Sequence, residues 1–312
     1  MARLLQALAL VALLLTDVEA SVAASPASPV VVSSKLSSES ALIGQMIRLL
    51  LEDRGIPTVD RMTLGATPVV RKALLAGEID VYVEYTGNAG FFFNRPDDPA
   101  WKDLQRGYEL GARLDREANR IVWLEPARAS NSWALAVRRD VAQQHRLVTM
   151  SDFARWVREG GNVKLACSAE FANAGTLRSL EQTYGFHLES RQKIVLAGGE
   201  TAATIGAAAA RTNDINTAMV YGTDGGIAAA SLVLLDDDKR DQPVYAPVPT
   251  IRQGVLQAWP QIADIVRPLM ASFTRESLQA LNARVQIDGE AAAEVAADYL
   301  RTQGFLRQPV RK

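Results

Sequence analysis

Short β-branched runs alternate with helical patterns along this chain, and this alternation restricts the fold more than any other feature. Residues 30–32 are three consecutive valines, typical of a strand buried on both faces. Apolar residues then recur at helical spacing before Gly55, namely Leu42, Ile43, Met46, Ile47, Leu50 and Leu51. We expect a helix here, capped by Ser37 or Ser38. Repetition of this unit predicts an α/β fold in which helices cover a mostly parallel sheet.

The next unit follows directly. Thr67 as N-cap and Pro68 in the first turn predict a helix that ends at Gly77. The next strand is expected to run through Ile79, Val81 and Val83. A second set of elements begins after Asn131, with strands predicted at 133–137, 163–166, 218–221 and 232–235, and helices at 153–157, 177–184 and 202–210.

Two sets of elements in a 312-residue chain indicate two lobes, because one hydrophobic core rarely serves so many residues. Three prolines, at 243, 247 and 249, favour an extended crossing back to the first lobe, which the C-terminal helices complete. We therefore predict a signal peptide at 1–24, lobe I at 29–130 plus 242–312, and lobe II at 131–241.

The N-terminus is typical of a secretory signal peptide. Arg3 precedes an apolar run at residues 4–15, and small residues follow at positions 20, 23 and 24. That run is shorter than the roughly 18 apolar residues that a permanent membrane helix requires. We therefore expect a periplasmic protein. Cys167 is the only cysteine, so no intramolecular disulfide is expected and stability has to come from burial.

Charge and motif content exclude several classes of function. The chain carries 34 basic and 35 acidic side chains without a basic patch, so nucleic acid is not an expected partner. Ser190 and Lys193 match S-x-x-K, but the other elements of that chemistry are missing. The sequence has two distant histidines and no phosphate-cradling glycine loop, so no catalytic residue, metal site or cofactor is expected.

Four aromatic residues stand at predicted strand ends or in turns, where side chains face a cleft: Tyr85, Trp133, Tyr221 and Tyr245. They lie in long stretches that include EYTG, SNSWALAVRRD, VKLACSAEF and YGTDG. In these stretches, and over essentially the whole chain beyond residue 29, the sequence resembles the osmoprotectant-binding proteins of betaine and choline ABC importers. The resemblance implies a two-lobed type II periplasmic binding protein with its ligand in the cleft between the lobes.

The resemblance also implies roles for individual residues. The four aromatic side chains would form a cage around a trimethylammonium group, with Trp133 where the family usually has tyrosine. A quaternary ammonium has no N–H to donate, so ring faces suit it better than polar acceptors do. Lys35 and Asn88 match positions that hold the ligand's carboxylate. Where many relatives carry an arginine after EF, this chain has Asn173 and Ala174, which predicts weaker betaine binding or a preference for choline.

The resemblance further implies a monomer that closes by hinge motion around a small quaternary-ammonium ligand and docks peripherally on a membrane permease. ABC permease and ATPase subunits are then the expected protein partners. Glycine betaine is the first candidate ligand, and choline or a related betaine are alternatives. Two other readings stay open: a sensory ligand-binding module that docks on a membrane receptor, and a periplasmic hydrolase. Glu84 and Asp224 are expected to build turns or hinge contacts.

Overall fold

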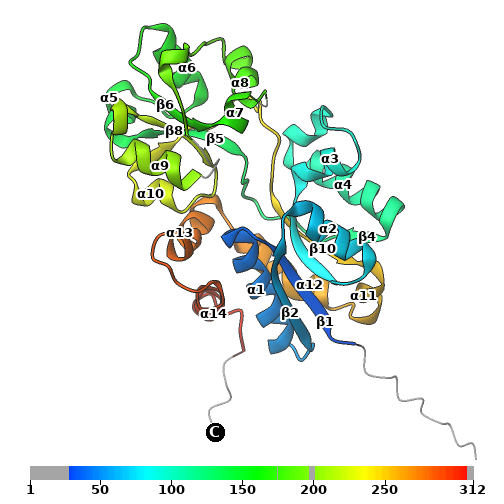
Figure 1. Ribbon diagram of the computed structural model, residues 1–312. Helices are drawn as coiled ribbons and strands as arrows, with labels where there is room; N and C mark the ends of the chain where they lie inside the picture. The colour runs from blue at the N-terminus through cyan, green and yellow to red at the C-terminus, as the bar shows by residue number, and fades with distance from the viewer. Residues whose placement is uncertain (1–27, 174, 197–200, 308–312) are drawn as a thin grey trace, which may run out of the picture.

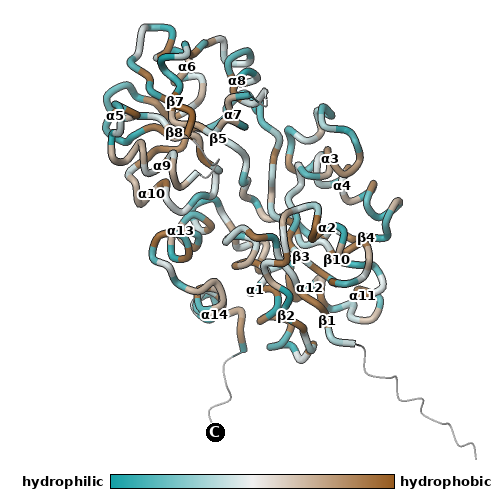
Figure 2. Tube along the Cα trace, in the orientation of Figure 1, coloured by the Kyte–Doolittle hydropathy of each residue, from teal (hydrophilic) through white to brown (hydrophobic). Residues whose placement is uncertain are grey.

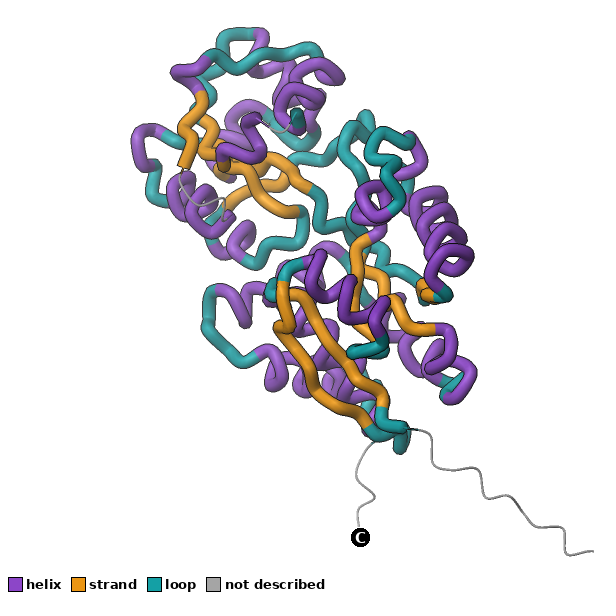
Figure 3. Tube along the Cα trace, turned by 45° about the vertical axis from the view of Figure 1, so that its right-hand side comes forward, coloured by secondary structure: helices purple, strands orange, loops and turns teal. Residues whose placement is uncertain are grey.

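The computed structural model describes residues 28–173, 175–196 and 201–307. The predicted signal peptide lies outside these ranges. The chain forms two lobes, and each lobe contains a five-stranded sheet with helices on both faces (Figure 1). The chain passes from one lobe to the other twice. In Figure 3 the strands of each sheet lie together, with helices beside them. The predicted two-lobed α/β architecture is confirmed.

The first sheet has the order β2-β1-β3-β10-β4. Its strands are β1 (Val30–Lys35), β2 (Thr58–Gly65), β3 (Val81–Tyr85), β4 (Ile121–Trp123) and β10 (Pro247–Arg252). β1 pairs in parallel with β2 and β3, whereas β10 is antiparallel to both β3 and β4. Four of the five strands therefore run in one direction, and β10 enters from the opposite end.

Side chains of this sheet alternate between two hydrophobic clusters. Val81 and Val83 pack on one face and Tyr82 packs on the other. The first face is covered by α1 (Ser38–Asp53), α12 (Ile262–Ser272), α13 (Arg275–Gln286) and α14 (Ala292–Thr302). The second is covered by α2 (Thr67–Ala76) and α4 (Leu104–Asn119). Short helices complete the lobe: η1 (Thr86–Asn88), α3 (Ala89–Phe92), η2 (Pro99–Lys102) and α11 (Gln253–Ala258). As predicted, the C-terminal helices finish the first lobe.

The starts of α1 and α2 test the predicted caps. The Ser37 hydroxyl accepts a hydrogen bond from Ser40 N, so Ser37 caps α1 as expected. The N-cap of α2 is Ala66, and the prediction of Thr67 was wrong by one residue. Pro68 then lies in the first turn, where its missing N–H has no helical partner to lose.

The second sheet has the order β7-β6-β8-β5-β9. Its strands are β5 (Trp133–Arg138), β6 (Leu165–Ser168), β7 (Lys193–Leu196), β8 (Thr217–Tyr221) and β9 (Leu232–Leu234). One face packs against α5 (Arg139–His145), α6 (Met150–Arg158), α7 (Ala169–Asn173) and α8 (Thr176–Tyr184). The other packs against α9 (Thr201–Ala209) and α10 (Gly226–Ala229), and the short turns η3 (Ser190–Gln192) and η4 (Thr212–Asp214) connect elements. β6 begins two residues later than predicted, because Val163 N donates to Gly161 O in the preceding loop.

Two crossing segments, residues 124–132 and 243–246, connect the lobes. The two segments lie side by side. Ala127 N donates to Pro247 O at 2.8 Å, and Asn131 N donates to Tyr245 O at 2.9 Å. Pro249 O accepts a hydrogen bond from Leu124 N. Because the nitrogen and the carbonyl of a strand residue point to the same side, the Pro249 nitrogen also points away from β3, and its missing N–H costs no hydrogen bond to β3. The exact lobe boundaries proposed from the sequence stay predictions.

Helix α13 makes a third contact between the lobes. Amide side chains at successive turns of this helix hold the backbone of residues 222–225 in lobe II. Gln279 Nε2 donates to Gly222 O at 2.9 Å, and Asn282 Nδ2 donates to Thr223 O at 2.8 Å. Gly225 approaches so closely that an added Cβ would lie 2.2 Å from the backbone nitrogen of Ala283. Only glycine allows this packing.

Hydropathy follows the layers. In Figure 2 the most hydrophobic stretches run along the strands inside each lobe, and polar residues lie on the outer loops and helices. Within residues 28–173, 175–196 and 201–307, we find no helix with the length and apolar character needed to cross a membrane.

Candidate functional site

The predicted site residues lie at the sheet edges from which the two crossing segments leave. Lys35, Tyr85 and Tyr221 are the last residues of the parallel strands β1, β3 and β8. Trp133 is the first residue of the antiparallel strand β5, and Tyr245 stands two residues before β10. These positions gather at the carboxyl ends of the parallel strands, where open α/β sheets bind ligands.

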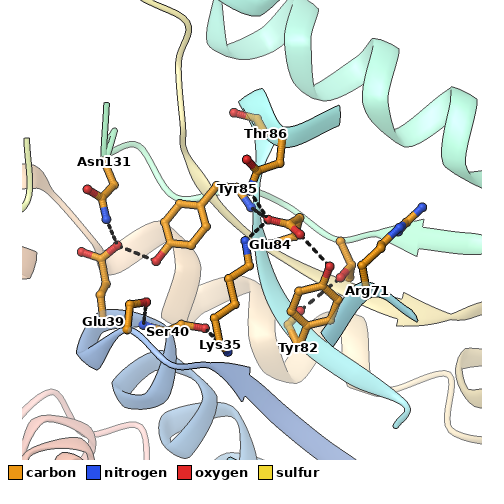
Figure 4. A network of polar contacts seen from close by, with 12 residues as sticks. Lys35, Glu39, Ser40, Arg71, Tyr82, Glu84, Tyr85, Thr86 and Asn131 are labelled. Carbon is orange, nitrogen blue, oxygen red and sulfur yellow. Dashed lines mark hydrogen bonds and ion pairs between the residues drawn. The ribbon is translucent and has the colours of Figure 1, made fainter. Parts of the chain in front are cut away.

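A buried carboxylate, Glu84, organises the lobe I part of the site (Figure 4). Glu84 is fully buried and forms an ion pair with Lys35 Nζ through Oε1. The same oxygen accepts from Tyr85 N at 2.7 Å and Asn88 Nδ2 at 2.6 Å. The other oxygen accepts from the Tyr82 hydroxyl at 2.6 Å. Both residues predicted to hold a ligand carboxylate, Lys35 and Asn88, thus donate to a carboxylate of the protein.

Tyr85 is tightly held and only 6 % exposed. Its hydroxyl donates to Glu39 Oε1 at 2.8 Å, and the Lys35 ammonium lies 4.9 Å from its ring centroid. Burial, followed by the negative charge of Glu39, raises the pKa of Tyr85 well above its usual range. The hydroxyl therefore stays a donor at physiological pH, and one ring face already meets a cation of the protein.

Glu39 connects this part of the site to the crossing and to lobe II. Its carboxylate accepts from Asn131 Nδ2 at 3.1 Å and from Asn282 Nδ2 at 2.7 Å, and the Asn282 amide also donates to Thr223 O. The sequence analysis missed Glu39, Asn131 and Asn282. An acidic residue in the first turn of a helix is common because it complements the helix dipole, so the sequence held no signal of this wider role.

In lobe II, Trp133 and Tyr221 lie against each other. They are register partners on β5 and β8, and their ring centroids are 6.2 Å apart with an interplanar angle of 21°. Trp133 also makes a T-shaped contact with Phe171 of α7, with ring centroids 5.8 Å apart. The Trp133 Nε1 atom is buried and has no hydrogen-bond partner among the described residues. The structure thus brings two of the predicted cage rings together, and Trp133 also contacts Phe171, a fully buried residue of the lobe II core that the sequence analysis missed.

Tyr245 lies between these two groups. Its ring packs on Gly87 so closely that a Cβ there would approach it to 2.8 Å. Burial raises the pKa of Tyr245, and the neighbouring Tyr221 and Glu84 raise it further. Tyr245 therefore neighbours groups of both lobes.

Asn173 ends α7, whereas Ala174 lies outside the described residues, so the predicted effect of a missing arginine stays a prediction.

A cavity of about 600 Å³ lies beside the crossing segments, and most of the predicted site residues do not line it. Trp133 is the only predicted site residue that lines it. Its charged side chains largely pair with each other, as in Arg275 with Asp236 at 2.7 Å and Arg240 with Asp103 at 3.6 Å. No group of three or more histidine, cysteine or acidic residues suited to a metal occurs in the part of the chain that the structure describes.

Comparison with known proteins places this geometry in a family. The family model for the substrate binding domain of ABC-type glycine betaine transport systems matches residues 28–302. The chain belongs to this family. Members of this substrate-binding family deliver small molecules to ABC importers, which bears out the predicted permease and ATPase partners at the level of the family. It is a solute-binding family and not an enzyme class.

Relatives within the family support the assignment. The chain is 49 % identical to the glycine betaine-binding protein YehZ of Escherichia coli over 282 residues, which cover 90 % of this chain and 92 % of YehZ. It is 30 % identical to a glycine-betaine-binding protein of Pseudomonas aeruginosa, with 88 % of each chain covered. The solved structure of apo YehZ superposes with a TM-score of 0.84 and covers 89 % of this chain and all of that one. The predicted periplasmic binding protein fold is confirmed.

Proposed function

We propose that this substrate-binding protein captures glycine betaine or a closely related quaternary-ammonium solute between its two lobes. Family membership, together with two relatives that are named for glycine betaine, supports the ligand class. The observation that carries the proposal is the position of four aromatic residues at the strand ends next to the crossing segments: Trp133 stacks with Tyr221 in lobe II, and Tyr85 and Tyr245 lie at the edge of lobe I.

Cation–π attraction explains why such rings suit this ligand. A methylated ammonium spreads its charge over apolar methyl groups and donates no hydrogen bond, so a ring face offers it both charge stabilisation and apolar contact. Each desolvated ring contributes about 0.5 to 2 kcal/mol, and indole is the strongest of these rings. Trp133 in place of tyrosine therefore preserves this kind of recognition.

The proposal includes location and assembly. Substrate-binding proteins of ABC importers are typically periplasmic, and residues 1–24 have the pattern of an export signal. We propose a periplasmic monomer that closes as the lobes rotate about residues 124–132 and 243–246, and that docks on its permease when loaded. Closure would bring the rings of lobe II onto the ligand and would favour the closed form by their added contacts.

Isothermal titration calorimetry of the mature protein tests the ligand. Glycine betaine, choline, carnitine and proline betaine form the panel, and glycine serves as the unmethylated control. We expect binding of at least one methylated ligand and none of glycine. Trp133→Ala should weaken binding by about 2- to 30-fold, the equivalent of one ring. Trp259→Ala, at the end of α11, is the matched control. Unchanged affinity in Trp133→Ala would remove this residue from the cage.

A further inference from the structure

The ion pair between Lys35 and Glu84 has a consequence for what the site can recognise. Lys35 lies at the end of β1 with its side chain only 9 % exposed, and the Glu84 side chain is fully covered. Both belong to lobe I, so the pair forms without any movement of the lobes. In Figure 4 the lysine extends alongside the Tyr85 ring to reach the glutamate.

Releasing Lys35 to a ligand would be costly. If Lys35 turned to a ligand carboxylate, Glu84 would lose its counter-ion inside the protein, and an unpaired buried charge is strongly unfavourable. Asn88 is also already bound to Glu84, because its Nδ2 donates to the same Glu84 oxygen at 2.6 Å. It would have to break this hydrogen bond to bind a ligand carboxylate. A ligand carboxylate would therefore compete with a protein carboxylate that is already in place and pre-organised.

The charge balance around Tyr85 points in the same direction. Glu39 and Glu84 flank this residue, and both are buried carboxylates, while Lys35 is the buried cation that contacts its ring. These three groups together carry one net negative charge. A ligand with a single positive charge balances it, whereas a zwitterion leaves it uncompensated and adds a third carboxylate nearby.

We propose that Glu84 sets the charge preference of this site: by holding Lys35 and Asn88, it leaves the ammonium end of the ligand to supply the affinity and makes a ligand carboxylate contribute little. Glu84 is thus a specificity-determining residue. The inference rests on the proposed function, because it presumes a methylated ammonium in the cage. It deepens that function by predicting that charge at the other end of the ligand is recognised weakly.

A pair of ligands isolates the carboxylate. Tetramethylammonium has the cationic head of glycine betaine without its carboxylate, so the ratio of their dissociation constants reports what the carboxylate gains. Calorimetry on the wild-type protein should show glycine betaine binding less than about tenfold more tightly than tetramethylammonium. In Glu84→Gln, which is isosteric but uncharged, Lys35 becomes available, and the ratio should shift towards glycine betaine by about tenfold or more.

Asp115→Asn is the matched control, because Asp115 is as deeply buried as Glu84 and is also paired with a lobe I cation, Arg71, outside the site. Its ratio should equal that of the wild type. The inference is overturned if wild-type protein binds glycine betaine tenfold or more tightly than tetramethylammonium, a readout that does not depend on any variant folding. It is also overturned if Glu84→Gln leaves the ratio unchanged. Failure of the wild type to bind these two ligands and every other methylated ligand of the panel overturns the proposed function itself.

Discussion

Replacing Tyr85 with phenylalanine separates the hydrogen bond of its hydroxyl group from the role proposed for its ring in ligand binding. The hydroxyl donates to the buried Glu39 at 2.8 Å, while the ring stands at the end of β3. Tyr85→Phe removes the hydrogen bond and keeps the ring. A hydrogen bond to a charged group contributes about 1.5 to 3 kcal/mol to stability. Because Glu39 keeps its bonds from Asn131 and Asn282, we expect the lower part of that range, about 2 kcal/mol.

Thermal unfolding measures this loss. At about 2 to 4 °C per kcal/mol for domains of this size, Tm should fall by about 4 to 8 °C. Since burial and Glu39 raise the pKa of Tyr85 well above 10, the hydroxyl stays protonated and the loss should be the same at pH 6 and pH 9. Ligand affinity, measured by calorimetry, should change by less than about threefold, because the ring that we propose to contribute cation–π attraction is retained.

Tyr108→Phe provides the control, because the Tyr108 hydroxyl donates to a neutral acceptor, Trp123 O, at 3.3 Å. A neutral bond is worth about 1 kcal/mol, so this variant should lose about half as much stability as Tyr85→Phe. The reasoning is refuted if Tyr85→Phe unfolds at the wild-type temperature but loses ligand binding. The hydroxyl would then act on the ligand and not on Glu39.

Three further changes test other parts of the structure. Gly87→Ala places a methyl group 2.8 Å from the Tyr245 ring, so calorimetry should show weaker ligand binding, by about tenfold, as the ring is displaced. Asp115→Asn breaks the buried ion pair with Arg71 and should cost about 3 to 5 kcal/mol in urea unfolding, because the arginine is left without a counter-ion. Asp152→Asn should flatten the fall in Tm below pH 4, because the pKa of Asp152 is lowered in the folded protein.

The sign of the pH effect follows from the surroundings of Asp152. Burial alone would raise its pKa, but hydrogen bonds from the backbone of Thr149 and Val148 and from the Thr149 hydroxyl lower it overall. A carboxylate with a lowered pKa contributes its stabilisation above its unfolded pKa and loses it as the pH falls through the folded one.

For Gly87→Ala the control is Gly254→Ala, whose methyl group meets nothing within 4 Å. Equal ligand affinity in the two glycine variants would contradict the assigned position of Tyr245.

Local patterns predicted the elements that carry strong periodicity. The helix after the first strand begins at its predicted cap, Ser37, because a serine N-cap and an apolar stripe are both local features. Strands β4 (Ile121–Trp123) and β7 (Lys193–Leu196) were not predicted.

The sequence by itself determined the two-lobed α/β plan and the strand-end positions of the predicted site residues, because β-branched runs, caps and turn residues act over a few positions along the chain. Only the tertiary structure decided what those residues do to one another. Lys35 and Glu84 are 49 positions apart and pair because β1 and β3 end at the same sheet edge. A buried charge needs a partner of opposite charge or hydrogen bonds, and the fold decides which residue lies close enough to provide them. The spacing of residues along the chain does not predict which residue that is.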